Sequence, residues 1–535
     1  MTSPVVIAVD AGTGSARALA FNLEGTLVAR AQREWTHAAV SGFPGGADFD
    51  TAGGWSLISS ALREVVGKLD GREILALGAS SMREGFVLYD AHGVEIFACP
   101  NTDGRARSQA DELVTRGVAD RIYELGGDWV SITAPSRLVW LLQERPDVMA
   151  RARHLGMLSD WVTYRLTGAF STDPTCGSSS ALFDLTRRDW SDELAGLVGI
   201  DRSLLPPVVE CGEVVGTVSI EAAAATGLPV GLPVTVGGAD TQLALHGIGA
   251  TSDRPTIVAG TFWQTTAVVD SPIIDPQRRL RTLCHVGTNS WMVEGIGFLS
   301  GLVMRWFRDA LAPESISAAA QLGTSPFDVI EGWALDVPRG SNGLVAVMAN
   351  AMRADAWHHA APAFVGIDIN DPTAFGRGAF ARSIEEAAAY VARAHLEILD
   401  DLTDSATTRG GHVDFTGGSS NGRLWPQVIA EVTGLTTDSS VVPEATSFGA
   451  ARLAASAVGE QIAPASAVER SVVPEAGAIA EYDVAYARWQ RVYAAQTEAT
   501  AQSGMNPLFT PPGGLAHRPF SSPTPKRMKQ ENHHG

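Results

Sequence analysis

Short runs of apolar residues that end in glycine-rich turns are the most regular feature of the chain. They cover residues 5–9, 74–80, 232–237 and 256–259. An apolar run of this length, closed by turn residues, is typical of a buried strand and too short for a helix. Residues 52–69 and 383–401 instead carry apolar residues at helical spacing. The pattern therefore predicts an α/β protein with polar side chains at the ends of its buried strands.

The pattern begins again halfway along the chain. Residues 249–254 are polar, and after them the order of apolar strand, Gly-Thr and second strand repeats the order in residues 5–21. A chain of 535 residues with 45% hydrophobic residues can bury more than one core. We expect two domains, 1–249 and 250–502. From about residue 503 the composition shifts to Pro, Ser, Lys and Gly, which predicts a disordered tail over 503–535.

The first strand leads into a polar turn, DAGTGSAR, at residues 10–17. Gly14 permits close backbone approach, and the hydroxyl groups of Thr13 and Ser15 add donors, so the turn can wrap an anion. Asp10 at the strand end can supply the carboxylate that Mg²⁺ takes beside phosphate oxygens and water. The alternative is an ordinary tight hairpin, since the turn contains neither GxxxxGK[ST] nor GxGxxG.

Two opposite charges, Arg83 and Glu84, follow the strand at residues 74–80. The guanidinium can donate to hydroxyl or carbonyl oxygens and the carboxylate can accept from hydroxyls, which would make a polyol clamp. The alternative is a surface ion pair that contributes little to stability. Asp103, in the polar turn NTDGR, is either the N-cap of the helix expected to run to about residue 119 or a further residue of the clamp.

Asp240 stands at the end of the strand at residues 232–237, directly after two glycines and an alanine. A carboxylate placed there can orient an attacking hydroxyl and accept its proton, which contributes roughly 10² to 10⁴ to a rate. We interpret Asp240 as a general base. The alternative is that it caps the short helix that includes residues 243–247.

The second half contains two further polar turns. Thr261 follows the strand at residues 256–259 and is expected to face phosphate groups. Gly417, Gly418 and Asn421 lie between a strand and a helix, where paired glycines let a flat ligand approach the backbone and the helix N-terminus favours negative charge. The pattern favours a nucleotide, and a plain strand-to-helix turn is the alternative.

The charge balance excludes some classes of protein. Lys and Arg number 40 against 59 Asp and Glu, giving a net charge of -19, which argues against a nucleic-acid surface. The N-terminus lacks the basic and apolar regions of a signal peptide, and no run reaches about 18 apolar residues. The four cysteines show no CxxC spacing, which predicts free thiols and no zinc site. We expect a cytoplasmic protein.

These motifs resemble those of the FGGY carbohydrate kinases, members of the actin-like ATPase superfamily, and the resemblance spans about residues 5–500. DAGTGSAR resembles the first phosphate motif, GGADTQ the second, with its catalytic aspartate, and TGGSSNGRLWPQVIAEVTG the adenosine motif. Within the family the chain is most similar to autoinducer-2 kinases, through SMREGFVLYD, ACPNTDGRAR, MLSDWVTYRLTG, AGTFWQ and LVMRWFRDA. One departure is TGGSSNG, where relatives carry GGGSKS or GGGSKG, so a lysine near the nucleotide is missing.

The resemblance implies two ribonuclease-H-like domains with an interdomain cleft, and ATP and Mg²⁺ as cofactors. Asp240 would be the base and Asp10 would help to hold the metal. The residues implied to contact the acceptor are Arg83, Glu84, Asp103 and Asp240. Those implied to contact phosphate or nucleotide are Thr13, Gly14, Ser15, Thr261, Gly417, Gly418 and Asn421. The implied acceptor is linear dihydroxypentanedione, the open form of autoinducer-2, phosphorylated on its terminal hydroxyl.

Two alternatives to this function stay open. The first is a kinase for another hydroxylated substrate, such as a pentulose or glycerol, which would use the same aspartate. The second is an ATP-dependent sensor that closes on nucleotide without phosphoryl transfer, and the presence of Asp240 argues against it. The expected partners are ATP and a small hydroxylated carbonyl compound, with no nucleic acid and no membrane. A homodimer is left open.

Overall fold

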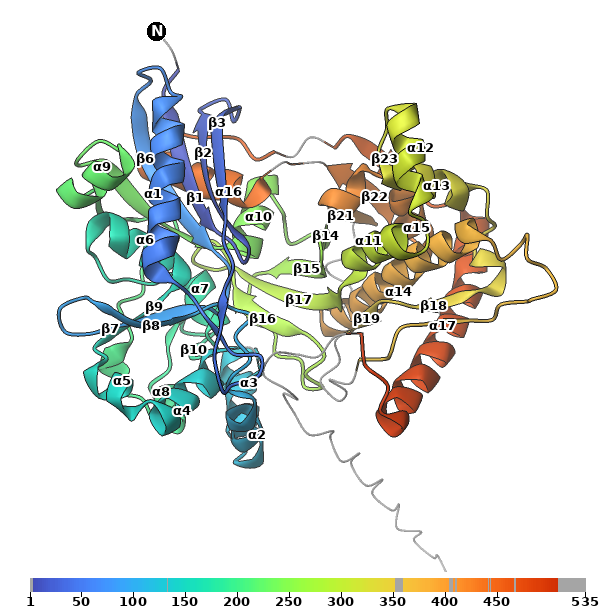
Figure 1. Cartoon of the computed structure of the whole chain (residues 1–535), viewed down its shortest axis with the longest axis horizontal. Coiled ribbons are helices and arrows are strands. Elements are labelled where there is room, and N and C mark those ends of the chain that lie inside the picture. The colour runs from blue at the N-terminus through green and yellow to red at the C-terminus, as the bar shows by residue number, and fades with distance from the viewer. Residues whose placement is uncertain are drawn as a thin grey trace, which may run out of the picture.

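The computed structural model describes residues 3–131, 133–351, 359–403, 408, 411–440, 442, 444–465 and 468–508. Figure 1 shows two α/β bodies, with the sheet of the N-terminal half on the left and the sheet of the C-terminal half on the right. The predicted α/β class with two domain-sized halves is therefore what the structure shows. The expected tail overlaps residues 509–535, which lie outside the described residues.

The first sheet has six strands in the order β12-β13-β6-β1-β2-β3. Their bounds are β1 Val5–Ala11, β2 Ser15–Asn22, β3 Leu27–Glu34, β6 Ile74–Ser81, β12 Val214–Thr217 and β13 Pro233–Ala239. Strands β1, β6 and β13 run parallel, so their carboxyl ends lie at one edge of the sheet. Asp10 is in register with Ser80 and Ala239 with Ser81, which gathers the ends of the three predicted buried strands.

The second sheet follows the order β16-β17-β15-β14-β21-β22-β23, with β19 also paired to β17. The bounds are β14 Thr256–Ala259, β15 Trp263–Val269, β16 Arg281–Cys284, β17 Trp291–Phe298, β19 Asn350–Ala351, β21 His412–Thr416, β22 Thr436–Ser440 and β23 Arg470–Val472. Strand β14 pairs antiparallel with β15 and parallel with β21, as β1 does with β2 and β6. The repeated order of motifs in the sequence thus corresponds to a repeated strand arrangement.

Helices cover both faces of each sheet. Around the first sheet lie α1 Thr51–Gly67, α6 Leu158–Thr167, α9 Ile220–Thr226 and α10 Asp240–Ile248. Around the second lie α11 Ser300–Ala310, α13 Pro326–Leu335, α14 Arg377–Thr403, α15 Leu424–Thr433 and α17 Ala476–Ser503. The apolar face of α14 packs against β21 and α15 in one buried cluster. Of the helices in the described ranges, none has the length and apolar character needed to pass through a bilayer.

Helix α16 (Ala445–Ala457) lies in sequence between β22 and β23 of the second sheet but packs on the first sheet, where Figure 1 shows it beside β1. Its small residues permit this close approach. A Cβ atom on Gly449 would lie 1.9 Å from the Leu243 carbonyl oxygen of α10, and one on Gly78 of β6 would lie 2.6 Å from the Ala450 carbonyl oxygen. Because α16 touches both α10 and β6, it joins the two halves beside Asp240.

A third group of elements lies below the first sheet in Figure 1. Its strands are β7 Phe86–Tyr89, β8 Glu95–Cys99, β9 His154–Met157, β10 Phe183–Asp184 and β11 Asp189–Trp190. Its helices are α2 Arg107–Thr115, α3 Val118–Gly126, α4 Ala134–Glu144, α5 Pro146–Arg151, α7 Pro174–Ser179 and α8 Asp192–Val198. The remaining short elements are β4 Ala38–Ala39, β5 Ala47–Asp48, β18 Val345–Val347, β20 Ala363–Val365 and α12 Glu314–Leu322.

The structure differs from the prediction at two places in particular. The helix expected to run to about residue 119 is two helices, α2 and α3, because Gly117 between them adopts a left-handed conformation with φ 74°. No helix is predicted for residues 476–503, where α17 has 28 residues. Four of its buried side chains recur at helical spacing, but exposed apolar residues such as Val484 and Ala480 obscure that pattern in the sequence; the buried residues are Ala478, Tyr482, Tyr486, Trp489 and Thr500.

Candidate active site

Arg83 and Glu84 lie in a tight turn directly after β6. Glu84 has φ 62°, a left-handed conformation that costs a residue other than glycine about 1 kcal/mol or more. Arg137 holds the turn, since its Nη1 donates to the Glu84 carbonyl oxygen at 2.7 Å. The next position requires glycine, because a Cβ on Gly85 would lie 2.5 Å from Leu158 Cδ1. The backbone thus fixes where both charges point.

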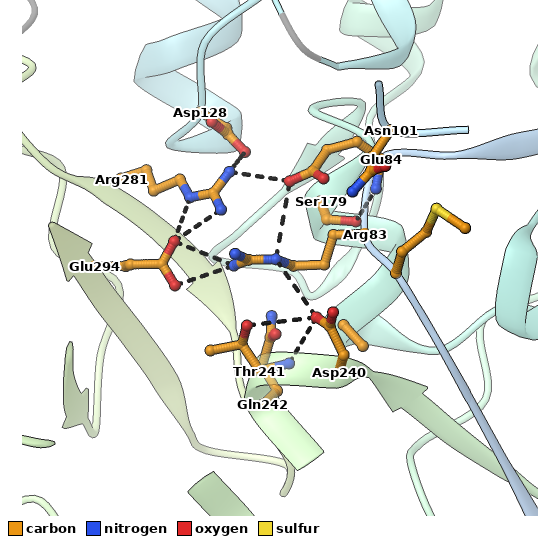
Figure 2. Close-up of polar contacts among 12 residues, drawn as sticks. Arg83, Glu84, Asn101, Asp128, Ser179, Asp240, Thr241, Gln242, Arg281 and Glu294 are labelled. Atoms are coloured by element: carbon orange, nitrogen blue, oxygen red, sulfur yellow. Dashed lines mark hydrogen bonds and ion pairs between the residues drawn. The ribbon is translucent and has the colours of Figure 1, made fainter. Parts of the chain in front are cut away.

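These two side chains belong to a cluster of charges, shown in Figure 2, in which every member except Asp240 is buried; its members are Arg83, Glu84, Asp128, Asp240, Arg281 and Glu294. Arg83 Nη1 donates to both carboxylate oxygens of Glu294, at 3.2 and 3.1 Å. Arg281 donates through Nη1 to Glu84 at 3.0 Å and to Asp128 at 3.3 Å, and through Nε to Glu294 at 2.8 Å. Arg83 and Glu84 are therefore not a solvated surface pair.

Burial and neighbouring charges act against each other inside this cluster. Burial opposes the charge of Glu294, but Arg281 and then Arg83 outweigh it and lower the pKa of the carboxyl group. Burial raises the pKa of Asp128 to about 6, although Arg281 partly counteracts it. The arginine Arg281 has its pKa raised by the surrounding acids despite its own burial, so it stays charged.

Asp240 is the first residue of α10 and stands at the edge of the cluster. Its Oδ1 accepts from the Thr241 backbone N–H at 2.7 Å and lies 3.9 Å from Arg83 Nε. The side chain is 38% exposed, yet enclosure by the protein raises its pKa to about 6. Arg83 lowers the pKa and the charge of Asp10 raises it further. The carboxylate is therefore held close to a cation without a direct hydrogen bond to it.

Strand β13 delivers Asp240 through a constrained backbone. Gly238 has φ 146°, and a Cβ there would lie 2.6 Å from the hydroxyl of Thr175. That hydroxyl accepts from the Ala239 N–H at 2.8 Å and itself donates to Asp173. The first turn of α7 therefore sets the position of the residue just before the aspartate.

Asp10 occupies the carboxyl end of β1, as predicted, and is 5% exposed. Ser80 Oγ donates to its Oδ1 at 2.7 Å, and burial raises its pKa although this hydrogen bond and Arg17 lower it. Within the described ranges, no group of three or more His, Cys, Asp or Glu side chains is arranged around a metal position. Mg²⁺ needs only one or two carboxylates beside phosphate and water, so Asp10 alone fits such an ion.

The turn after Asp10 exposes Thr13 and Gly14 at its tip, while Ser15 is 8% exposed at the start of β2. The Asn101 amide donates to the Thr13 hydroxyl at 3.1 Å. Trp35 Nε1 donates to the Thr13 carbonyl oxygen at 3.2 Å, which turns that carbonyl group away from the tip. The exposed N–H and hydroxyl groups of the tip are therefore available to an anion.

A cavity of about 630 Å³ lies in the C-terminal half, within the size range of small-molecule sites. Its lining includes three of the predicted nucleotide residues, Thr261, Gly418 and Asn421, together with Gly260, Gly301, Met304, Arg305, Phe327, Glu331, Glu385 and Trp425. Gly417 supports the wall from behind: it has φ 101°, and a Cβ would lie 2.6 Å from the Ala259 carbonyl oxygen. Four predicted residues from two turns, one after β14 and one after β21, thus gather at one cavity.

Two glutamates, Glu331 and Glu385, line this cavity. Burial raises the pKa of Glu385 well above its ordinary value, and the neighbouring Glu331 raises it further. Glu331 accepts from the Leu424 N–H at 2.6 Å, at the start of α15. A protonated carboxyl group at Glu385 can donate a hydrogen bond, which a carboxylate is unable to do.

Asp103 lies apart from the charge cluster. Its carboxylate accepts from Arg105 Nε at 2.8 Å and from the Ala47 N–H at 2.9 Å, and its side chain is fully buried. It is not the N-cap of α2, which begins after Ala106. A direct contact between Asp103 and the acceptor stays a prediction. Its observed contacts fix the turn that also contains Asn101, whose amide contacts Thr13.

Three charged residues of the cluster are absent from the predicted site: Asp128, Arg281 and Glu294. Glu294 does carry a sequence signal, because it is the only charge in the apolar strand WMVEGIGF. Asp128 and Arg281 carry none, since each stands among ordinary loop or strand residues. Their role becomes visible only when the two halves are placed together.

Two models of known protein families match most of the chain. The N-terminal domain of the FGGY family of carbohydrate kinases matches residues 5–247, and the C-terminal domain of the same family matches residues 256–458. The chain belongs to the FGGY family of carbohydrate kinases. It is accordingly a phosphotransferase that uses ATP and an alcohol acceptor, as the resemblance implies.

Relatives of this FGGY kinase align with it over most of the length of both chains. It is 36% identical to the autoinducer-2 kinase of Salmonella typhimurium over 520 residues, and this alignment covers 95% of this chain and 97% of that protein. It is 37% identical over 503 residues to the autoinducer-2 kinase of Yersinia pseudotuberculosis, over 92% and 94% of the two chains. The family predicted from the motifs is therefore confirmed.

Solved structures agree on the fold. A xylulose kinase from Rhodospirillum rubrum, 25% identical, superposes with a TM-score of 0.83 over 93% of this chain and 100% of that one. The glycerol kinase of Plasmodium falciparum, solved with ADP, has a TM-score of 0.78 over 92% and 98% of the chains at 17% identity, which bears on fold alone. The two-domain sugar-kinase architecture of this FGGY kinase is thus shared with enzymes of different acceptors.

Proposed function

We propose that this FGGY kinase phosphorylates the terminal hydroxyl of linear dihydroxypentanedione, the open form of autoinducer-2, in the processing of that signal. Two relatives above 35% identity over more than 90% of the chain are named autoinducer-2 kinases. The observation that carries the proposal is the buried Arg83–Glu84 pair with Asp240 beside it. A guanidinium, a carboxylate and a base at one edge suit a small compound rich in carbonyl and hydroxyl groups.

In the proposed mechanism, Asp240 orients the acceptor hydroxyl and takes its proton during in-line attack on the γ-phosphate. Arg83 donates to an acceptor oxygen while Glu84 accepts from another hydroxyl. The proton leaves the hydroxyl for the Asp240 carboxylate, and the oxygen gains the phosphoryl group as the bond to ADP breaks. A pKa of about 6 leaves Asp240 mostly unprotonated at neutral pH and basic enough to help.

The remaining predicted residues would serve the nucleotide. Thr13, Gly14 and Ser15 would contact its phosphates from the first half, and Thr261 from the second. Gly417, Gly418 and Asn421 would bound the nucleoside. We assign Asp10 as the residue that holds Mg²⁺, which would neutralise phosphate charge when bound. We also propose that the enzyme acts in the cytoplasm, where ATP is available.

An assay of ADP release tests the proposal. Purified protein is incubated with Mg-ATP and one acceptor at a time: dihydroxypentanedione, D-xylulose, D-ribulose, glycerol or none. We expect turnover with dihydroxypentanedione to exceed turnover with the others by at least about tenfold in kcat/KM, which corresponds to about 1.4 kcal/mol. A preference for another compound of the panel would overturn the acceptor but leave the phosphotransferase.

A pentulose is the second candidate acceptor. It is favoured by the likeness to the xylulose kinase from Rhodospirillum rubrum, which has the higher identity of the two solved structures described above. D-xylulose in the same assay decides between the two substrates. ATP binding without turnover on any acceptor would instead support the sensor alternative.

A further inference from the structure

The charge cluster contains contacts that cross from one half of the enzyme to the other. Glu294 lies on β17 and Arg281 on β16, both in the second sheet, whereas Arg83 and Glu84 follow β6 of the first sheet. The pairs Arg83–Glu294 and Arg281–Glu84 therefore join residues 211 and 197 positions apart. Figure 2 shows both C-terminal side chains reaching the acceptor pair from the side opposite Asp240.

We propose that Glu294 and Arg281 are positioning residues for the acceptor clamp: they hold Arg83 and Glu84 in the geometry that binds the acceptor, and only when the two halves are together. The proposal deepens the proposed function and rests on it for the identity of the acceptor. Neither residue is part of a predicted motif, and neither is a candidate for direct contact with the transferred phosphate.

The distances around Arg83 carry the first step. Its Nη1 is bound by the two oxygens of Glu294, whereas its Nε lies 3.9 Å from both Glu84 and Asp240. A separation of 3.9 Å is too long for a hydrogen bond. The Nε edge of the guanidinium therefore faces two acids without being satisfied by either, and an acceptor oxygen can take that donor.

The second step follows from removing Glu294. A buried guanidinium that loses its carboxylate partner turns to the nearest acid, because an unpaired buried charge is costly. The nearest acids are Glu84 and Asp240. A direct ion pair with Asp240 would occupy both the donor that binds the acceptor and the carboxylate that activates it. Glu294 thus keeps the clamp and the base apart.

Arg281 holds Glu84 in position, as Glu294 holds Arg83. Its Nη1 donates to Glu84 Oε1 at 3.0 Å and to Asp128 at 3.3 Å, while its other nitrogens bind Glu294. The planar guanidinium can satisfy three acids at once, which the single ammonium group of lysine does less well. Arg281 is 1% exposed, so these contacts are shielded from competing water. Arg281 therefore sets the orientation of two carboxylates beside Arg83, those of Glu84 and Glu294.

The test compares Glu294→Gln with wild type in steady-state kinetics, using whichever acceptor of the panel the wild-type enzyme phosphorylates. We expect the KM for the acceptor to rise about 10- to 100-fold, with kcat reduced, while the KM for ATP stays within about twofold, because only the clamp is disturbed. Glu294→Asp, which keeps the charge, should recover part of the acceptor affinity.

Arg188→Lys is the matched control. Arg188 is also a buried arginine that crosses between the halves, since it donates to the carbonyl oxygens of Ser290 at 2.7 Å and His285 at 3.2 Å. It touches neither Arg83 nor Glu84 among the contacts of the described residues. We expect this variant to lower the melting temperature without a change in the KM for the acceptor, which separates positioning from general loosening of the interface.

Each outcome decides the proposal. If Glu294→Gln does not fold, Arg281→Lys replaces it, with the same expected rise in the KM for the acceptor. An acceptor KM within twofold of wild type, or a rise matched by Arg188→Lys, would overturn the positioning role while the proposed function stands. A wild-type preference for a pentulose would overturn only the proposed acceptor. No acceptor-dependent turnover in wild type would overturn both.

Discussion

At the scale of single residues, the site depends on carboxylates whose surroundings differ. Asp240 faces Arg83 at 3.9 Å and is partly exposed, whereas Asp10 is nearly covered and bound by Ser80. Asp240 therefore keeps a lone pair that can accept from a substrate hydroxyl, and Asp10 keeps one carboxylate oxygen that can bind a cation. Two aspartates at the same edge of one sheet, with β6 between their strands, can therefore have separate tasks.

Replacing Asp240 by asparagine tests its role as the base. The amide has nearly the same shape but takes no proton, so we expect kcat to fall by about 10² to 10⁴. Binding of ATP, measured by calorimetry, should change little, because the nucleotide cavity is lined by residues of the C-terminal half. Retained turnover in a folded variant would remove Asp240 from the mechanism.

The pH dependence follows from the same group. Burial raises the pKa of Asp240 to about 6, and the groups facing it are Arg83, Glu84 and Asp10. The unprotonated form is the base, so activity is present above this pKa and lost below it. We expect kcat/KM for the acceptor to fall about tenfold per pH unit below about pH 6. A profile that stays flat to about pH 5 would contradict this assignment.

Residues at strand ends could be predicted from the sequence, and those of the cross-half cluster could not. Asp10, Arg83 and Asp240 each follow a short apolar run, so local sequence places them at one edge of a parallel sheet. Arg281 meets Glu84 across 197 positions, and no local pattern records that contact. Asp103 shows the limit of local motifs, because its ion pair with Arg105 depends on folding of the loop.

At the scale of elements, the crossing of α10 and α16 determines how Asp240 is held. A Cβ on Gly247 would lie 2.5 Å from the Ala445 carbonyl oxygen, and one on Gly449 would lie 1.9 Å from that of Leu243. Thr446 Oγ1 donates to the Asp240 carbonyl oxygen at 3.1 Å. The glycines therefore bring a C-terminal helix into contact with the first turn of the helix that carries the base.

Gly449→Ala should weaken this crossing. The added methyl group meets backbone, which does not move aside easily, so we expect a loss of about 1–3 kcal/mol in stability and a reduced kcat. Thermal unfolding and steady-state kinetics measure the two effects. Gly196→Ala in α8 is the control: its Cβ meets nothing within 4 Å, and alanine should be neutral or stabilising by up to about 1 kcal/mol.

The strands at residues 5–9, 74–80, 232–237 and 256–259 were predictable because each is a short apolar run that leads into a turn. The position of helix α16 on the sheet of the other half has no signal in its own sequence. The break at Gly117 and helix α17 escaped prediction, since one depends on a single left-handed residue and the other has exposed apolar residues that obscure its buried positions.

At the scale of the whole molecule, the groups that we propose for phosphoryl transfer are divided between the halves. The proposed base and acceptor pair follow strands of the first sheet, and the cavity proposed for the nucleotide lies in the second half. On this assignment, neither half alone holds a complete site. The charge cluster and helix α16 are the contacts that bring the groups together.

This division predicts slow hydrolysis of ATP in the absence of an acceptor. Water lacks the carbonyl and hydroxyl groups that Arg83 and Glu84 bind, so it gains little from the clamp that orients the acceptor beside Asp240. We expect ADP release without acceptor to be at least about 10²-fold slower than with it. Similar rates in the two conditions would show that the clamp contributes nothing to positioning.

Strand β17 has a consequence for the energetics of ligand binding. It carries Glu294 to Arg83 and ends at Phe298, after which the Gly301 N–H donates to the Thr261 carbonyl oxygen at 3.3 Å, in the wall of the nucleotide cavity. Strand β17 and the start of α11 after it therefore connect the proposed acceptor clamp to the proposed nucleotide cavity. Any factor by which nucleotide tightens the acceptor must equal the factor by which acceptor tightens the nucleotide, because free energy is a state function. If this factor exceeds one, ATP in excess of its Kd holds the enzyme in the form that binds the acceptor more tightly.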